Sequence, residues 1–324
     1  MPVHNALPHL DAAVESVLTQ TEGDFEFVIL DDASSDGSTE RLREWASRDD
    51  RIRLIESAER LGPAVSSQRV AAAATAPIVA RMDADDVSHP DRLREELAVF
   101  ARHPEAGVVA SLCNFIDANG AKLRSSEAWR LALRSPFVPF AHGAMMYRRE
   151  VFDRAGGYRA ACAYWEDQDL ITRMAAIAPV MVIPRALYEV RLWLNSTRAA
   201  SDRDPLEQAA NLAFRCIDRL ERNESYEDLL EASDGLKEKV DPRAFITLGS
   251  QTLWAGGRPR TFRRLLSKGR LGFDKRTLAA LIWTAWASAS PATLRGILRL
   301  RVAAKNRLAS PQSLPDGPVI WRQR

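Results

Sequence analysis

Apolar and polar positions along the first half of the chain follow two alternating patterns. Apolar residues three and four positions apart in 7–20 predict a helix, whereas the mainly apolar run 25–30 is typical of a buried strand. Further strands are expected at 53–56, 76–80 and 108–115, and further helices after Thr39 through Trp45, at 65–74 and at 91–102. Strands that alternate with helices predict an α/β fold with a mostly parallel sheet flanked by helices.

Short polar segments mark where these elements begin and turn. Asp36 or Ser38 is expected to cap the second helix, and Ser88 to cap the helix at 91–102, which Pro90 would open. The dipeptide Asn-Gly at 119–120 predicts a hairpin turn after the strand at 108–115. These signals support the same alternation of helices and strands.

Acidic residues come directly after two of the expected strands. Asp31 and Asp32 follow 25–30, and Asp83 and Asp85 follow 76–80. Open α/β sheets bind ligands at the carboxyl ends of their strands, where carboxylates can accept hydrogen bonds from ribose hydroxyls and base N–H groups. The pattern therefore indicates a nucleotide site, although acidic residues in a turn are also common on a solvated surface.

The hexapeptide RMDADD at 81–86 concentrates carboxylates between an expected strand and an expected helix. Hard oxygen ligands suit Mg²⁺ or Mn²⁺, which take one or two carboxylates together with substrate phosphates. A calcium loop is a weaker interpretation, because Ser88 stands at the sixth position, where such a loop has glycine. A phosphatase that uses Asp83 as nucleophile is also weak, since no matching downstream Lys and Asp motifs are evident and Asp31 and Asp32 would have no role.

Four motifs in order, over about 170 residues, resemble those of family 2 glycosyltransferases, which have the GT-A fold. They are MPVHN at 1–5, the segment from QT to DDASSDGS at 20–38, DADD at 83–86 and the block from HG through RRE and GGY to EDQDL at 142–170. The resemblance covers roughly residues 1–200. It implies a Rossmann-like α/β fold and an inverting transfer from a nucleotide-diphosphate sugar.

The resemblance also implies a role for each matched residue. The donor nucleotide and its sugar would be bound by Pro2, Val3, Asn5, Asp31, Asp32, Arg69, Asp83, Ala84 and Asp85. Asp83 and Asp85, the DXD motif, would hold Mn²⁺ or Mg²⁺ on the diphosphate. Asp167 resembles the general base and Glu166 would position the acceptor or donor sugar, although acids also suit the first turn of a helix. His142 and Trp165 would lie on the acceptor side.

The chain departs from the family pattern in two places. It begins inside the first motif, whereas the family has an apolar strand before it, so we expect a start upstream of Met1. Trp193 stands where the family often has a histidine that completes the metal shell. Water or phosphate would then fill that ligand position.

The last part of the chain differs from the rest in charge. From Ala255 onward there are 15 Lys and Arg against 2 Asp and Glu, whereas the remainder has 30 against 41. We therefore expect a catalytic domain at 1–204, with its first strand truncated, and a basic helical region at 205–324, with helices at 206–222, 226–239, 242–255, 261–268, 275–288 and 291–308. A basic amphipathic helix can lie on an anionic membrane surface, but an ordinary packing domain with a solvated basic face explains the same pattern.

Composition and cysteines limit the class of protein. The apolar share of 46% and the charged share of 27% are those of a globular protein, and no apolar run is long enough to span a membrane. Cys113, Cys162 and Cys216 are widely spaced, which favours reduced thiols over disulfides or a zinc site. With no signal peptide evident, we expect a cytoplasmic protein, with peripheral attachment at the inner membrane face as an open alternative. No nucleic-acid motif is recognised.

Two functional interpretations remain. The first is an inverting, metal-dependent glycosyltransferase that uses a UDP-linked donor and a glycan or lipid-linked acceptor, as in polysaccharide biosynthesis of the cell envelope. The second is a degenerate sugar-nucleotide-binding or scaffold protein, which Trp193 and the short N-terminus favour. Asp85 and Asp167 argue for the enzyme, because both are present at the positions that metal binding and proton abstraction need.

Overall fold

The computed structural model of the 324-residue chain describes residues 1–125, 140–162, 166–192 and 317–321. The chain divides into two compact units, one of Met1–Phe115, Ser125–Arg191 and Ser313–Arg324, the other of Ile116–Arg124 and Leu192–Gln312. Most of the second unit lies outside the described residues, as do Trp165, Trp193 and the helices expected between 206 and 308. None of the described helices has the length and apolar content needed to cross a membrane.

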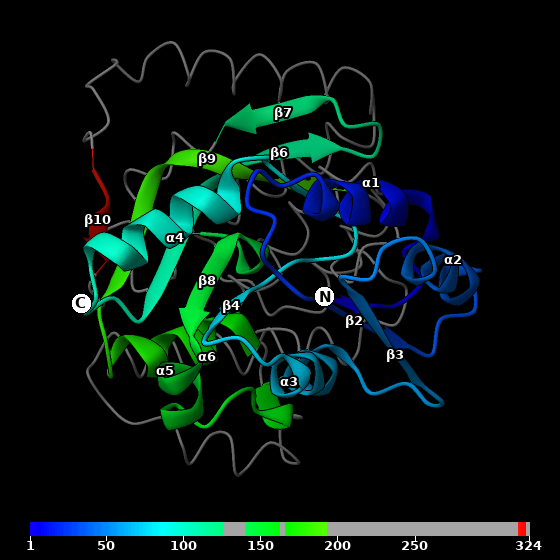
Figure 1. Ribbon diagram of the computed structural model, residues 1–324, viewed down its shortest axis with the longest axis horizontal. Helices are drawn as coiled ribbons and strands as arrows, with labels where there is room; N and C mark the ends of the chain where they lie inside the picture. Colours follow the sequence, from blue (N-terminus) through cyan, green and yellow to red (C-terminus); the bar gives the residue numbers. More distant parts are fainter. Residues whose placement is uncertain (126–139, 163–165, 193–316, 322–324) are drawn as a thin grey trace, which may run out of the picture. The chain divides into compact units, whose positions relative to one another are not determined.

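The described elements follow one another in the order labelled in Figure 1. The helices are α1 (Leu7–Leu18), α2 (Ser38–Ala46), α3 (Pro63–Ala73), α4 (Arg92–Arg102), α5 (Arg149–Arg154) and α6 (Glu166–Ala175), with 3₁₀ turns η2 (His142–Ala144) and η3 (Ala160–Cys162). The strands are β1 (Pro2–Val3), β2 (Phe27–Asp32), β3 (Ile52–Ser57), β4 (Ile78–Ala80), β5 (Val87–Ser88), β6 (Val108–Asp117), β7 (Lys122–Ser125), β8 (Met145–Arg148), β9 (Val180–Leu192) and β10 (Val319–Trp321).

The first three strands form a parallel sheet in the order β1-β2-β3. Val3 of β1 is paired with Asp31 of β2, which is paired in turn with Glu56 of β3. All six residues of β2 are buried, as expected for the central strand of a parallel sheet covered by helices. Helix α3 packs against β1 and β2, and α2 packs against β3. The predicted parallel sheet with flanking helices is confirmed here.

The second sheet has the order β10-β9-β6-β8-β4, with β5 on β9 and β7 on β6. Its pairs β4–β8, β6–β8, β5–β9 and β9–β10 are antiparallel. The strand expected at 76–80 therefore exists, but it joins an antiparallel pair. The sequence pattern predicted none of β8, β9 and β10, so parallel pairing covers less of the fold than expected.

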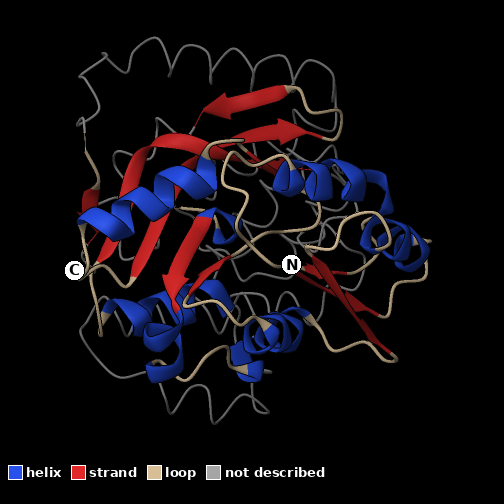
Figure 2. Ribbon diagram, viewed as in Figure 1, coloured by secondary structure: helices blue, strands red, loops and turns tan. Residues whose placement is uncertain are grey.

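Alternate residues of this sheet face two different helical layers. Val109 of β6, Met146 of β8 and Met181 of β9 pack with Leu93 and the rest of the α4 face. Their neighbours Val108, Met145, Tyr147, Val180 and Val182 pack instead with α5 and α6 and with Trp321 of β10. Because side chains alternate across a strand, α4 covers one face of the sheet while α5 and α6 cover the other, as Figure 2 shows.

The predicted cap at Ser88 is wrong. Ser88 belongs to β5, where it is paired with Tyr188, and α4 begins at Arg92 after Asp91. The amide group of Gln20 explains the difference, because its Nε2 donates to Ser88 Oγ at 3.2 Å and its Oε1 accepts the N–H of Leu93 at 3.0 Å. A side chain from the segment just after α1 thus provides the cap that the sequence pattern assigned locally.

The expected hairpin turn is confirmed, and the expected cap of α2 is confirmed in part: the N-cap is Gly37, between the two residues expected, and Asp36 supplies a side-chain hydrogen bond. Asp36 accepts the N–H of Ser38 at the start of α2 at 3.0 Å, and its second oxygen accepts the N–H of Leu7 at the start of α1, also at 3.0 Å. Ser38 Oγ accepts the N–H of Ala6 at 3.1 Å. One loop therefore caps two helices. The hairpin between β6 and β7 turns at Gly120, whose φ of +82° explains the glycine.

Candidate active site

The acidic turn, residues 83–86, follows β4 and precedes β5. Asp83 and Asp85 are half-buried, whereas Ala84 and Asp86 are buried. The turn therefore keeps two carboxylates partly accessible and encloses the third.

Strand β9 fixes the backbone of the acidic turn. The Tyr188 hydroxyl accepts the N–H of Asp83 at 3.1 Å, and Arg191 Nε donates to the carbonyl of Asp85 at 2.8 Å. The Arg191 N–H donates to Asp86 Oδ1 at 2.8 Å. A Cβ on Gly143 would lie 2.0 Å from the Tyr188 hydroxyl, so only glycine leaves room for this arrangement.

Asp86 differs from its two acidic neighbours in its surroundings. Burial, and then the charges of Asp85 and Asp83, hold the pKa of Asp86 well above its ordinary value. Tyr188 and the Arg191 N–H bind its oxygens. Asp86 therefore anchors the turn to β9, while Asp83 and Asp85 are the carboxylates that remain within reach of a ligand.

Arg81 lies immediately before the turn and is 9% exposed. Its Nη2 pairs with Asp83 Oδ1 at 2.8 Å, and its Nη1 donates to the carbonyl of Met82. Burial opposes the charge of Arg81, but Asp83, Tyr158, Tyr188 and Glu166 outweigh it and raise the pKa of the guanidinium. A buried cation thus faces the acidic turn.

Glu166 and Asp167 form the first residues of α6. Glu166 is 8% exposed, and burial followed by the charge of Asp167 raises the pKa of Glu166 to about 7. Asp167 is half-buried, and its Oδ1 accepts the N–H of Gln168 at 2.7 Å. Arg81 and Asp83 both act electrostatically on Glu166. The predicted catalytic dipeptide and the acidic turn are therefore parts of one site.

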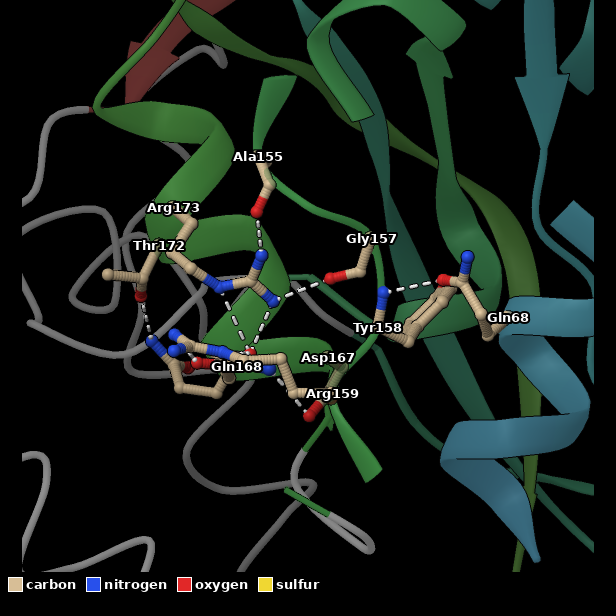
Figure 3. A network of polar contacts seen from close by, with 10 residues as sticks. Gln68, Ala155, Gly157, Tyr158, Arg159, Asp167, Gln168, Thr172 and Arg173 are labelled. Atoms are coloured by element: carbon tan, nitrogen blue, oxygen red, sulfur yellow. Dashed lines mark hydrogen bonds and ion pairs between the residues drawn. The ribbon is translucent and has the colours of Figure 1, made fainter. Parts of the chain in front are cut away.

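A buried ion-pair network holds α6 in place, and Figure 3 shows its hydrogen bonds. Asp169 is completely buried, and Arg159 Nη2 donates to its Oδ1 at 2.7 Å. Arg173 Nη2 donates to Asp169 Oδ2 at 2.5 Å and to the carbonyl of Gly157 at 2.8 Å. Arg173 Nη1 donates to the carbonyl of Ala155. The first turn of α6 is thereby fixed to the loop that follows α5.

The same loop reaches α3 and the acidic turn. Tyr158 N donates to Gln68 Oε1 at 2.8 Å, and a Cβ on Gly157 would lie 2.4 Å from that oxygen. The Tyr158 hydroxyl lies 2.7 Å from His142 Nε2. Tyr158 also interacts electrostatically with Arg81, so it borders the site. His142, expected on the acceptor side, is buried here and supports Tyr158.

The two acids that end β2 have different partners. Asp31 Oδ2 accepts the hydroxyl of Thr39 at 2.7 Å, while its Oδ1 is buried and has no hydrogen-bond partner in the described part of the chain. The carboxylate of Asp32 accepts three hydrogen bonds, from Arg60 Nη1 at 2.7 Å, Leu61 N at 2.6 Å and Gly62 N at 3.0 Å. Asp31 retains an acceptor for a ligand, whereas Asp32 anchors the turn before α3.

The other residues predicted to bind a nucleotide lie around β1 and α3. Asn5, after β1, and Ala33, after β2, both have positive φ values of 51° and 53°, which non-glycine residues adopt at a cost. Asn5 Oδ1 accepts the N–H of Ser35 at 2.8 Å and so joins the two strand ends. Pro2 and Val3 form β1 itself. Arg69 is exposed on α3.

The first strand and the acidic turn are close together. Met1 is buried, and its backbone nitrogen lies within electrostatic range of Arg81 and Asp83. The start of β1, the end of β4 and the start of α6 therefore lie near Arg81 and Asp83.

The donor set at the acidic turn fits a divalent cation that is shared with a phosphate ligand. Asp83 and Asp85 are hard oxygen donors, and Asp83 also pairs with Arg81. No group of three or more His, Cys, Asp and Glu side chains arranged for a metal occurs among the residues that the structure describes. Two carboxylates suit Mg²⁺ or Mn²⁺ with water and phosphate oxygens in the remaining positions, and they do not suit a cage made of protein alone.

Sequence reasoning missed four residues that organise this site, namely Arg81, Gly143, Tyr158 and Tyr188. Arg81, Gly143 and Tyr158 stand inside segments that were singled out in the sequence, but the sequence did not indicate what these residues do. Tyr188 gave none, because it lies in a strand that the apolar pattern did not predict.

Comparison with known proteins adds the following. The model of Glycosyl transferase family 2 matches residues 1–165. The putative glycosyltransferase EpsE of Bacillus subtilis is 31% identical over 179 residues, which cover 53% of this chain and 64% of that protein. The chain therefore spans less than two thirds of this relative.

Solved structures share the fold. TarS 1–349 of S. aureus in complex with UDP-GlcNAc matches with a TM-score of 0.54 and 13% identity, over 99% of this chain and 95% of that one. The mannosyltransferase PcManGT from Pyrobaculum calidifontis, in complex with GDP-Man and Mn²⁺, matches with a TM-score of 0.50 and 20% identity, over 95% and 86%. These likenesses confirm the predicted GT-A fold.

Proposed function

The chain belongs to glycosyl transferase family 2, and from this premise we propose that it transfers a sugar from a nucleotide-diphosphate donor to a hydroxyl group of an acceptor. The observation that carries the proposal is that the acidic turn and Glu166, at the start of α6, act on each other across one site. Donor binding and proton abstraction need these two groups of carboxylates close together.

We propose a UDP-linked donor. TarS, which shares the fold, was solved with UDP-GlcNAc, whereas PcManGT was solved with GDP-Man. The spare Oδ1 of Asp31 is suited to accept a base N–H or a ribose hydroxyl. In this proposal Pro2, Val3 and Asn5 line the nucleotide from the β1 side, and Asp32 shapes the pocket through the turn before α3.

Asp85 and Asp83 would hold Mn²⁺ or Mg²⁺ together with the donor diphosphate. A bound divalent cation supplies positive charge that stabilises the leaving nucleoside diphosphate. The β9 contacts to the acidic turn support this role, because they fix the turn backbone and leave the two carboxylates accessible. Arg69 is exposed on α3 and is proposed as a further contact of the nucleotide.

Asp167 is proposed as the general base. Its half-buried carboxylate can be reached by an acceptor, whereas the buried Glu166 beside it is placed to orient a sugar. Asp167 takes the proton from the acceptor hydroxyl while that oxygen forms a bond to the anomeric carbon. The bond from the anomeric carbon to the diphosphate oxygen breaks on the opposite side. The configuration at the anomeric carbon is therefore inverted.

The acceptor is proposed to be a glycan or a lipid-linked glycan. His142 and Tyr158 are both buried and hydrogen-bonded to each other beside Glu166, so in this proposal they support the acceptor side from the core. Trp165, next to Glu166 in the sequence, is proposed as the aromatic contact of the acceptor and lies outside the described residues.

A donor screen tests the proposal. Hydrolysis and binding of UDP-, GDP- and dTDP-sugars would be measured with Mn²⁺ or Mg²⁺ on the parent protein, Asp85→Ala and Asp167→Asn. Asp153→Asn, at an exposed position of α5, is the matched control. We expect metal-dependent turnover of one donor, lost in the first two variants and kept in the control. Binding without turnover that Asp167→Asn does not change would favour a binding protein, and no binding would reject the proposal.

A further inference from the structure

One peptide unit beside the site is held from both sides, as Figure 3 shows. It joins Gly157 to Tyr158 in the loop that follows α5. Its N–H donates to Gln68 Oε1 of α3 at 2.8 Å, and its carbonyl accepts a hydrogen bond from Arg173 Nη2 of α6, also at 2.8 Å. This shared peptide therefore links α3 to α6 through two direct hydrogen bonds.

Glycine at position 157 is what permits the approach of Gln68. Gly156 and Gly157 both have positive φ values, of +79° and +66°. A Cβ on Gly156 would meet no atom of the described residues within 4 Å, whereas a Cβ on Gly157 would lie 2.4 Å from Gln68 Oε1. Backbone conformation alone explains the first glycine, but the second glycine also leaves the space that the Gln68 side chain occupies. The loop is therefore shaped to receive Gln68.

On the α6 side, the shared peptide is attached to the ion-pair network of that helix. Arg173, which binds the peptide carbonyl, also donates to Asp169 Oδ2 at 2.5 Å, and Asp169 is completely buried. Asp169 lies in the same first turn of α6 as Asp167, the proposed base. A displacement of the peptide would therefore reach the start of α6, where a small misplacement of a base is costly to the reaction.

On the α3 side, Gln68 belongs to a helix that borders the proposed nucleotide site. The helix begins directly after the turn whose amide groups donate to Asp32. Arg69, the proposed further contact of the nucleotide, is the residue after Gln68. Helix α3 also packs against β1 and β2, which carry other proposed nucleotide ligands. A nucleotide bound there would therefore restrain the helix that carries Gln68.

We propose that Gln68 is a positioning residue of the transfer reaction, which holds Asp167 in place relative to the donor through the shared peptide and Arg173. Gln68 acts through these groups and not on the reacting atoms. Its side-chain oxygen faces the peptide, because the amide nitrogen of glutamine cannot accept an N–H. The role rests on the proposed function, since donor binding beside α3 and proton abstraction at α6 are the two events that it joins.

We expect a nucleotide bound beside α3 to change the local opening of α6. UDP should slow amide hydrogen exchange in α3 directly and in α6 through the Gln68 contact, since exchange reports local opening. Removing the acceptor oxygen of Gln68 should leave the first effect and abolish the second. A contact that contributes only to stability would alter exchange in the free protein but not the response of α6 to UDP.

Hydrogen exchange followed by mass spectrometry, with and without UDP and Mn²⁺, tests this role, with GDP in place of UDP if GDP is the nucleotide that binds. Gln68→Met removes the acceptor and keeps the length of the side chain, whereas Gln68→Glu keeps an oxygen at that position. Arg149→Met is the matched control. Arg149 donates to the carbonyls of Ala71 at 3.2 Å and Ala74 at 2.5 Å, so it joins α5 to the carboxyl end of α3 by a separate route.

In the parent, Gln68→Glu and Arg149→Met, UDP should slow exchange in α6 as well as in α3, whereas in Gln68→Met only α3 should respond. Hydrolysis of the donor that the screen identifies, with water in place of the acceptor, gives a second readout. The turnover number of Gln68→Met should fall roughly tenfold to a hundredfold. Its KM and UDP dissociation constant should stay close to those of the parent. If Gln68→Met does not fold, Gln68→Asn, whose amide ends one methylene short of the peptide, replaces it.

The outcomes separate this role from the proposed function. If UDP binds but α6 does not respond in the parent, or responds equally in the parent and Gln68→Met, the role of Gln68 is wrong and the transferase proposal stands. Loss of the α6 response in Gln68→Glu or in Arg149→Met would also reject the role, since the acceptor oxygen would then not be what matters. If no nucleotide binds at all, the proposed function and the role of Gln68 are rejected together.

Discussion

The hydroxyl of Tyr188 accepts the backbone N–H of Asp83 at 3.1 Å, although the two residues are 105 positions apart in the chain. The contact is made on the N–H of the first acid of the turn, so it fixes the turn without occupying the carboxylate. Tyr188 also binds the buried Asp86. One phenol thus ties both ends of the acidic turn to β9.

Replacing Tyr188 by Phe should loosen the acidic turn. The variant removes one oxygen and leaves the Asp83 N–H unpaired, so we expect a loss of about 1–3 kcal/mol in the free energy of unfolding. Mn²⁺ affinity should fall roughly tenfold, as for changes behind metal-binding carboxylates. Urea unfolding and a calorimetric Mn²⁺ titration measure the two effects.

Tyr147→Phe is the matched control for this substitution. Tyr147 is equally buried but packs in the core, where its ring is stacked on Phe152 with centroids 5.1 Å apart. We expect it to leave Mn²⁺ affinity unchanged. Equal loss of Mn²⁺ affinity in both tyrosine variants would contradict the assigned role of Tyr188.

Asp169→Asn should destabilise the protein strongly. The change removes the negative charge that two arginines, Arg159 and Arg173, share in a buried position. Breaking a buried ion pair by neutralising one partner leaves uncompensated charge, and we expect a loss of roughly 3 kcal/mol. Urea unfolding would be compared with that of Asp153→Asn on the exposed side of α5, which should change stability by less than about 0.5 kcal/mol. A loss below 1 kcal/mol for Asp169→Asn would show that the arginines find other partners.

The contrast between what the sequence predicted and what it did not follows from the range of the interactions. Apolar spacing located α1, β2 and β3 to within two residues, because the signal for each lies inside the element. Strand β8 was not predicted, because it forms through pairing with strands that are far away in the sequence. Met146 is paired with Ala80 on one side and with Val109 on the other. The cap that Gln20 provides to α4 comes from 73 positions away and has no local signature.

The same contrast between local signals and remote interactions applies to the candidate site. The motifs located Asp83, Asp85 and Asp167, since each is a matter of residue type at a fixed spacing. They could not show that Asp31 has a spare oxygen while Asp32 has none, because this depends on where the turn before α3 lies. Nor could they reveal the contact of Gln68 with the loop that follows α5, which exists only in the assembled fold.

Stability should fall as pH rises through about 7, because of Glu96. Burial raises the pKa of Glu96 to about 7 against the opposing effect of Arg92, whose Nε donates to Glu96 Oε2 at 3.3 Å. The folded state therefore binds a proton that the unfolded state releases near its ordinary value of 4.5. This contribution is fully present below about pH 4.5 and is lost as pH rises through about 7, with a size of roughly 3 kcal/mol.

Glu96→Gln isolates this contribution from that of Glu166, whose pKa is also raised to about 7. Melting temperatures between pH 5.5 and 8.5 should fall less steeply for the variant than for the parent. Glu15→Gln, at an exposed position of α1, should keep the parent slope. Parallel curves for the parent and Glu96→Gln would mean that Glu96 is ionised throughout this range.

Replacing the two acids at the end of β2 one at a time should affect nucleotide binding and protein stability separately. Asp31→Asn replaces a spare acceptor by an amide that no longer offers two oxygens, so we expect UDP affinity to fall by roughly tenfold to a hundredfold with less than about 1 kcal/mol of lost stability. Asp32→Asn weakens three hydrogen bonds to the turn before α3, one of them from Arg60. Here we expect a loss of roughly 2–3 kcal/mol in the free energy of unfolding. Calorimetric UDP titration and urea unfolding of both variants decide the assignment. If the two effects are exchanged, so that Asp32→Asn affects only binding and Asp31→Asn only stability, Asp32 is the nucleotide ligand and Asp31 the structural acid.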